Sequence, residues 1–146
     1  MTSALGSMVR VHRWILDEKR QKLAEIERFG DRMRQDLERL DENLASERDA
    51  AARSSDGTLA FASFIAAALE RRRRLVDSIT NLEHEADLAR DEVSEAFREL
   101  KKYEMAETNA KEREGLRRKK QEQLALDEVG VGLYRRRSSG TDGGEA

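Results

Sequence analysis

The sequence predicts an all-α protein: a two-helix antiparallel coiled-coil hairpin with a longer second helix and a flexible C-terminal tail. Two long segments each carry an apolar repeat with a period of seven residues, which lines one stripe of a helix and drives coiled-coil pairing. The 146-residue chain contains no proline, so no residue forces a helix to stop. Charged residues make up 40% of the chain and aromatic residues 5%, which favours long solvated helices over a thick core.

The first helix is expected from about residue 7 to residue 53, after a flexible N-terminus at residues 1–6. Its apolar stripe consists of two alternating sets of positions, which we call the seam. One set is Val9, Leu16, Leu23, Gly30, Leu37, Leu44 and Ala51, and the other is His12, Lys19, Ile26, Met33, Leu40 and Glu47.

The second helix is expected from about residue 57 to residue 129, before a disordered tail rich in Gly and Ser at residues 130–146. The hairpin therefore spans residues 7–129, with its turn at residues 53–58. The seam of the second helix also has two sets of positions. They are Ile65, Arg72, Ile79, Ala86, Val93 and Leu100, and Phe61, Ala68, Leu75, Leu82, Ala89, Ala96 and Tyr103.

The register of the two helices follows from the position of the turn. In an antiparallel hairpin the residue numbers of facing seam residues add up to one constant, and the seven-residue period allows 105, 112 or 119. Only 112 centres the hairpin on Asp56, within a segment whose Ser, Asp and Gly residues favour a turn and a helix cap. This register also sets large residues against small ones, as at Leu23 and Ala89.

Residues beyond about 104 have no partner within the hairpin. Two pairs of opposite charge four residues apart, Glu107 with Lys111 and Glu114 with Arg118, support this part of the helix. A single helix stabilised mainly by such pairs is marginal, so we expect it to become ordered on a partner. Its basic cluster is Arg117, Arg118, Lys119 and Lys120, and its target is an acidic protein surface or a nucleic acid.

The start of the second helix is more apolar than the seam requires. Leu59, Phe64 and Leu69 lie off the seam, and exposed apolar residues grouped near one end of a coiled coil often mark a binding surface. Packing around Phe61 or self-association of the turn ends are the alternatives. Trp14, the only tryptophan, lies off the seam near the other end and is a plausible interface anchor.

Four successive arginines, Arg71 to Arg74, resemble a phosphate-binding patch. Successive helical residues point in different directions, so a solvated face with Arg72 at the seam is the simpler interpretation. The chain carries a formal charge of −2, which argues against nucleic acid as the main partner.

No motif for catalysis, cofactor binding or metal binding is found. The two histidines, His12 and His84, are far apart in the predicted hairpin, so no metal site is expected. The chain has no cysteine, which fits a reducing compartment. No signal-peptide core is present, and the longest apolar run, Leu59 to Leu69, is too short to span a membrane. We therefore expect a cytoplasmic protein that is not an enzyme and has no cofactor.

Three segments resemble the flagellar type III export protein FliJ family. They are residues 9–26, with the Asp17-Glu18-Lys19-Arg20 step and the Leu23-Ala24 continuation, residues 99–104, Glu-Leu-Lys-Lys-Tyr-Glu, and the Leu126-Asp127-Glu128 ending. The resemblance covers about residues 7 to 130. The alanine-rich stretch from Leu59 to Leu69 and the Gly-rich tail have no counterpart in it.

The resemblance implies a stalk-like, non-enzymatic component of the export apparatus. Such a protein binds and stimulates the flagellar export ATPase, contacts the cytoplasmic domain of the export gate membrane protein, handles export chaperones, and is peripheral to the inner membrane through these partners. The residues expected to face the ATPase are Trp14, Lys101, Lys102, Arg117, Arg118, Lys119 and Lys120, and those expected to face the gate or the chaperones are Leu59, Phe64 and Leu69. The alternative function is a structural or dimerising coiled-coil spacer unrelated to export.

Overall fold

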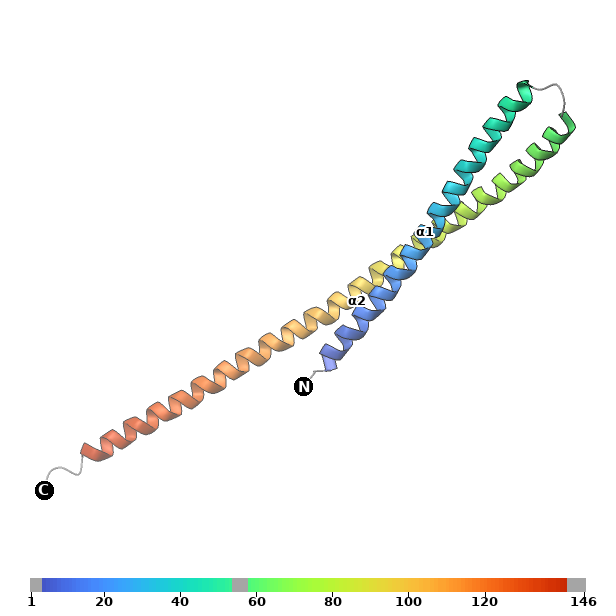
Figure 1. Ribbon diagram of the computed structural model, residues 1–146. Helices are drawn as coiled ribbons and strands as arrows, with labels where there is room; N and C mark the ends of the chain where they lie inside the picture. The colour runs from blue at the N-terminus through green and yellow to red at the C-terminus, as the bar shows by residue number, and fades with distance from the viewer. Residues whose placement is uncertain (1–3, 54–57, 142–146) are drawn as a thin grey trace. The chain divides into compact units, whose positions relative to one another are not determined.

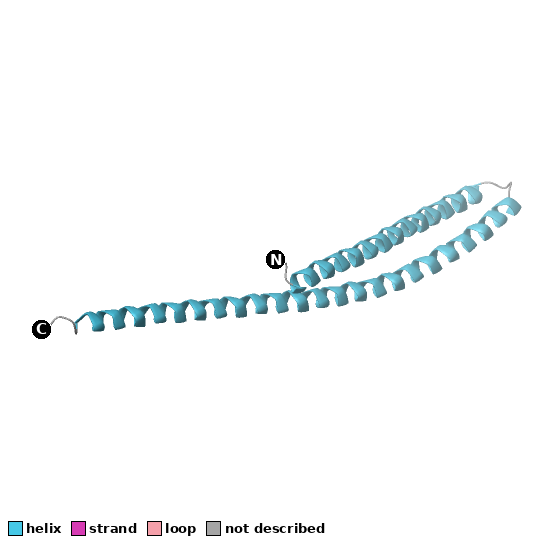
Figure 2. Cartoon of the chain, turned by 90° about the horizontal axis from the view of Figure 1, so that it is seen from below, coloured by secondary structure: helices cyan, strands magenta, loops and turns pink. Residues whose placement is uncertain are grey.

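The computed structural model describes residues 4–53 and 58–141, and each of these segments is a single helix. Helix α1 is Ala4–Arg53, with 50 residues, and helix α2 is Thr58–Thr141, with 84 residues. Within the described residues there is no strand (Figure 2). The predicted fold class, a helical hairpin with a longer second helix, is confirmed. The absence of proline is the local reason why both helices run without interruption.

The chain divides into two compact units. The hairpin unit comprises residues 10–100, and the terminal unit comprises residues 1–9 together with 101–146. In the hairpin unit α1 and the first half of α2 lie side by side and run in opposite directions (Figure 1). In the terminal unit the described residues, 4–9 and 101–141, are helical throughout.

The core consists of the predicted seam. Each buried apolar residue of the described chain is a predicted seam position, and none of the buried residues is polar or charged. Because only two helices form the core, it is one layer of side chains thick. Leu37 and Leu75 stay partly accessible at its edges. The buried apolar residues are Val9, Leu16, Leu44, Ala68, Ile79, Ala86, Ala89, Ala96 and Leu100.

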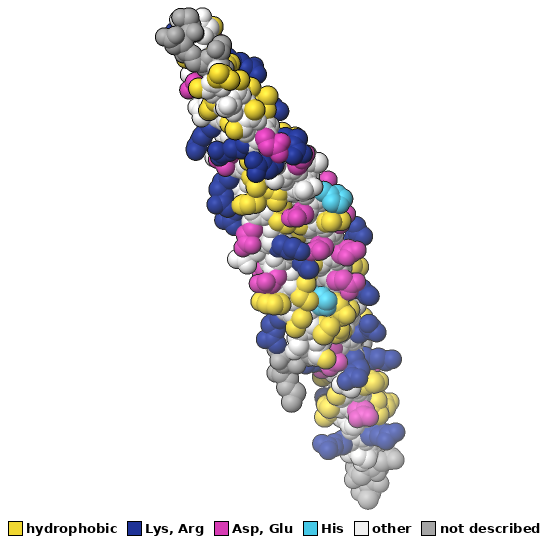
Figure 3. Space-filling model, turned by 90° about the vertical axis from the view of Figure 1, so that its right-hand side faces the viewer, with side chains coloured by type: hydrophobic (Ala, Val, Ile, Leu, Met, Phe, Trp, Pro, Cys, Tyr) yellow, Lys and Arg dark blue, Asp and Glu magenta, His cyan; other side chains and the backbone are white. Residues whose placement is uncertain are grey.

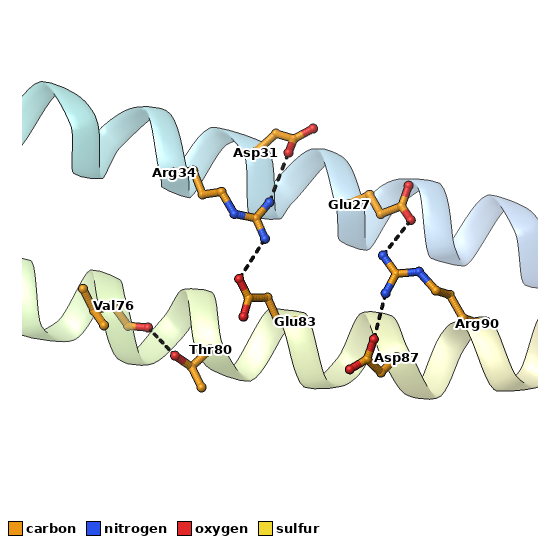
Figure 4. A network of polar contacts seen from close by, with 8 residues as sticks. All are labelled: Glu27, Asp31, Arg34, Val76, Thr80, Glu83, Asp87 and Arg90. Carbon is orange, nitrogen blue, oxygen red and sulfur yellow. Dashed lines mark hydrogen bonds and ion pairs between the residues drawn. The ribbon is translucent and has the colours of Figure 1, made fainter.

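Ion pairs between α1 and α2 confirm the predicted register. In the 112 register, each position on one flank of α1 lies four residues after a seam residue, and its counterpart on α2 lies one residue after the facing seam residue. The numbers of two such flanking residues therefore add up to 117. Arg34 Nη2 lies 3.1 Å from Glu83 Oε1, and Arg90 Nη2 lies 3.3 Å from Glu27 Oε1, and the numbers of both pairs add up to 117 (Figure 4). Registers of 105 or 119 place other residues opposite one another on this flank.

The opposite flank gives the same result. There the flanking residue of α1 lies one before a seam residue, and its counterpart on α2 lies three after the facing seam residue. The 112 register therefore predicts that the numbers of such pairs add up to 114. Lys22 Nζ lies 3.5 Å from Glu92 Oε2, and these numbers add up to 114. Lys19 Nζ lies even closer to the same carboxylate oxygen, at 3.2 Å.

The predicted turn at residues 53–58 lies largely outside the described residues, since 54–57 are not described. Helix α1 ends at Arg53 and α2 begins at Thr58, so the helices end on either side of the predicted turn.

The outer ends of the helices differ from the sequence-based expectation. Helix α1 begins at Ala4 rather than near residue 7, and α2 continues to Thr141 rather than ending near residue 129 with an irregular tail from Gly130. Gly130 and Gly132 each weaken a helix by about 1 kcal/mol relative to alanine but do not terminate it. The residues after them include the helix formers Leu133 and Arg135. Residues 1–3 and 142–146 lie outside the described residues.

Candidate partner-binding surfaces

The turn-end surface consists of Leu59, Phe64 and Leu69 at the start of α2. Their exposed fractions are 86%, 41% and 46%. Phe64 precedes the seam residue Ile65 and Leu69 follows the seam residue Ala68, so the two side chains lie on opposite edges of the seam. Figure 3 shows hydrophobic side chains between the grey residues at this end and the first dense band of basic side chains. The chain thus presents apolar surface at the turn end of the hairpin unit, and its use as a binding site stays a prediction.

Three arginines of the run that follows, Arg72, Arg73 and Arg74, lie near carboxylates. Arg72 Nε donates to Asp41 Oδ1 across the seam at 2.8 Å. Arg73 donates two hydrogen bonds to Glu70, the shorter one 2.7 Å long. Arg74 Nε lies 3.9 Å from the same carboxylate. The hydrogen bond from Arg73 and its positive charge lower the pKa of Glu70. These contacts support the solvated-face interpretation of the run over a phosphate patch.

Trp14 lies on the outer face of α1 within the hairpin unit. Its side chain is 65% exposed, and that of Val11, three residues earlier on the same face, is 50% exposed. The use of Trp14 as an interface anchor stays a prediction.

The basic residues of the set expected to face the ATPase lie in the terminal unit. Lys101 Nζ donates to Glu104 Oε2 at 3.1 Å, and Lys102 is exposed. The predicted pair of Glu107 with Lys111 is confirmed at 2.8 Å, and that of Glu114 with Arg118 at 3.9 Å. Local pairs thus support this part of α2 as the sequence predicted.

The cluster Arg117–Lys120 is exposed throughout. Arg117 and Arg118 both lie near Glu114, which is a neighbour on the same helix. Trp14 belongs to the hairpin unit and the basic residues to the terminal unit. Their joint use by one partner therefore stays a prediction.

One exposed apolar surface was not predicted from the sequence. Leu126, Val129 and Leu133 lie on α2 with exposed fractions of 71%, 60% and 55%. The helix was expected to end near residue 129, and that boundary separated Leu133 from the other two. The signal in the sequence is their spacing of three and four residues, which places side chains on one face of a helix.

A small groove lies beside the seam at Gly30, with a volume of about 410 Å³. It exists because glycine leaves the seam without a side chain opposite Leu82. Its walls are two charge clusters, Asp31–Arg34–Glu83 and Glu27–Arg90–Asp87 (Figure 4). Each arginine pairs with one carboxylate on its own helix and one on the other helix, so these groups link α1 to α2 beside the groove.

The two histidines are separated as expected. His12 lies partly buried at the seam and His84 is exposed on α2. In the part of the chain that the structure describes, no group of three or more His, Cys, Asp or Glu side chains is close enough to hold a metal ion. None of the helices over residues 4–53 and 58–141 is long and apolar enough to cross a bilayer.

The fold and these surfaces define a class: an antiparallel coiled-coil hairpin with exposed apolar and basic side chains. The family model of the flagellar FliJ protein matches residues 1–139. The chain belongs to the FliJ family and is a coiled-coil protein associated with flagellar export. No curated protein and no solved structure matches it. The spacer function unrelated to export is thereby set aside.

Proposed function

We propose that this protein is a non-enzymatic, stalk-like component of the flagellar export apparatus that binds and stimulates the export ATPase. The observation that carries the proposal is the extent of α2. Tyr103 is the last predicted seam residue, yet the helix continues to Thr141 with charged and apolar side chains exposed to solvent. An isolated helix without tertiary contacts is only marginally stable in water, and contacts with a partner supply the missing stabilisation.

The basic residues of the terminal unit are the proposed contacts with the ATPase. Lys102, Lys119 and Lys120 are exposed, and the one glutamate beside Arg117 and Arg118 is Glu114, a near neighbour on the same helix. Short-range pairs in water are weak and exchange readily. An acidic surface on the ATPase can therefore replace them, and Trp14 and Lys101 complete the proposed ATPase-facing set.

The turn-end surface is the proposed contact with the export gate or with export chaperones. Leu59, Phe64 and Leu69 leave apolar area in water, which favours association with an apolar surface of a partner. We place the protein in the cytoplasm, at the inner-membrane base of the flagellum through these partners. It acts there without catalytic residues or cofactors of its own and without binding nucleic acid.

The test is ATP hydrolysis by the purified export ATPase with and without this chain. We expect the intact chain to stimulate hydrolysis, and we expect a chain ending at Tyr103 to bind and stimulate less because the proposed contacts are gone. The hairpin of the shortened chain stays folded, since its core lies at the seam. No stimulation by the intact chain contradicts the proposed function.

Charge variants locate the contact. Replacing residues 117–120 by glutamine is expected to reduce stimulation. Replacing Arg71 to Arg74 by glutamine is the matched control, because it removes four positive charges from the hairpin unit. Equal loss from both variants contradicts the assignment to the terminal unit and indicates a general effect of charge.

A further inference from the structure

The last turns of α2 carry an apolar stripe that no other described residue covers. Leu126, Val129 and Leu133 are more than half exposed. At about 100° per residue their side chains fall within an arc of about 60°. Glu122 lies on the same line one turn earlier, so the stripe begins after it. Leu124 and Val131, also exposed, lie on the opposite face of the helix.

Basic residues border this stripe on both sides. Seen along the helix axis, Arg136 lies about 60° from Leu133 on one side, and Arg137 lies about 40° from it on the other. About five turns earlier on α2, Arg118 points in the same direction as Arg136, and Lys119 points in the same direction as Arg137. Among the acidic residues between Arg118 and Arg137, Asp127 and Glu128 point about 100° or more away from the stripe, and Glu122 lies on its line, before Leu126. Near the C-terminal end of α2, Figure 3 shows hydrophobic side chains with basic side chains and an acidic one beside them.

This pattern restricts what can cover the stripe. A second copy of the chain would bring arginines of one stripe against arginines of the other, because both flanks are basic, and like charges beside a coiled-coil seam repel. If the stripe bound an uncharged apolar groove of another protein, the basic residues on both flanks would have no negative charge to pair with. The surface that fits must be apolar at its centre and negative at its rim.

A bilayer containing anionic lipids has both properties. Its headgroups are negative, and its acyl chains lie directly beneath them. An amphipathic helix in the bilayer plane buries its apolar stripe, while flanking arginines extend along it to the phosphates. We propose that residues 126–137 bind directly to the surface of an anionic membrane. This contact goes beyond the proposed function, in which the membrane is reached only through protein partners.

The experiment is flotation of the full-length chain with lipid vesicles, without any export protein. The vesicles are phosphatidylcholine alone or phosphatidylcholine mixed with phosphatidylglycerol. We expect binding to the mixed vesicles, little binding to phosphatidylcholine alone, and weaker binding as the salt concentration rises. No binding to the mixed vesicles overturns the proposal and leaves an acidic protein groove as the candidate for the stripe.

Paired variants test which face binds. Replacing Leu126 and Leu133 by serine is expected to weaken binding by about tenfold or more, because two side chains no longer enter the apolar layer. Leu124→Ser with Val131→Ser, on the opposite face, is expected to change binding little. Equal losses from the two variants overturn the proposal.

The arginines are tested in the same way. Arg136→Gln with Arg137→Gln removes the flanks of the stripe, whereas Arg117→Gln with Arg135→Gln removes the same charge from the opposite face. We expect the first variant to lose several times more binding than the second. Equal losses mean that the charge acts without orientation, which contradicts the proposed face. The ATPase is absent from these assays, so their failure leaves the hydrolysis test of the proposed function untouched.

Discussion

Arg34 of α1 and Glu83 of α2 form an ion pair across the seam, with 3.1 Å between Nη2 and Oε1. The other terminal nitrogen of Arg34, Nη1, donates to Asp31 on its own helix. The guanidinium is held over Gly30 in this way, and its Nη1 is the nearest atom to a Cβ built on that glycine, at 3.6 Å. One arginine thus links the two helices beside the one seam position that has no side chain.

The first prediction follows from this geometry. Gly30→Ala is expected to raise the free energy of unfolding by about 1 kcal/mol, because alanine favours the helix and its methyl group meets Arg34 at an ordinary contact distance. Thermal unfolding followed by circular dichroism measures this gain. Gly130→Ala is the control: it has open space but lies in the terminal unit, so the main transition should not move. A loss of stability from Gly30→Ala contradicts the described packing.

The second prediction concerns the seam. Leu44 is 5% exposed and faces Ala68 in the 112 register. Leu44→Asp is expected to cost about 3 kcal/mol or more, because it removes buried apolar surface and places a charge between the helices. Arg73→Gln, at an exposed position, is expected to change the unfolding midpoint little. Similar midpoints for the two variants would show that Leu44 is not in the core.

The third prediction is a pH dependence. The hydrogen bond from Lys19 to Glu92, together with the charges of Lys19 and Lys22, lowers the pKa of Glu92 below its ordinary 4.5. A carboxyl whose pKa is lower in the folded state stabilises the fold above its unfolded pKa, and this contribution is lost as the pH falls through the lowered value. Glu92→Gln should therefore destabilise the hairpin near neutral pH.

The measurement is a series of thermal melts of both proteins from neutral pH to well below 4.5. The difference between wild type and Glu92→Gln should shrink below that ordinary pKa and vanish once the carboxyl is protonated in the folded state. It should also shrink at high salt, because the pair is exposed and screened. A difference that stays constant with pH would exclude the ion pair as its cause.

The fourth prediction concerns the turn end. Phe64→Ser with Leu69→Ser should reduce binding to the purified gate domain or to chaperones without cargo, while stimulation of the ATPase is retained. Both side chains are partly exposed, so the hairpin should stay folded. Pull-down experiments measure the binding. The matched control is Leu88→Ser with Phe97→Ser, which removes the same residue types elsewhere on α2. Equal losses in both assays would refute separate surfaces.

The sequence by itself determined the seam. Residues spaced alternately three and four apart must share one face of any helix they form, so the spacing alone predicts the buried positions from Leu16 to Leu100. The pairs Glu107–Lys111 and Glu114–Arg118 were predictable for the same reason, since they depend only on spacing along one helix. The exposure of Phe64 and Leu69 also follows from their place off the seam.

The features that depend on the distance between the two helices were decided only by the tertiary structure. Ala89 is 2% exposed, whereas the larger Leu23 opposite it stays partly accessible, because a short side chain lies deep between the backbones and a long one reaches past it. The pairing of Arg34 with Glu83, the groove at Gly30 and the continuation of α2 to Thr141 likewise depend on distances and on a balance of small energies. Spacing along the sequence sets directions around a helix axis, but it does not set these distances.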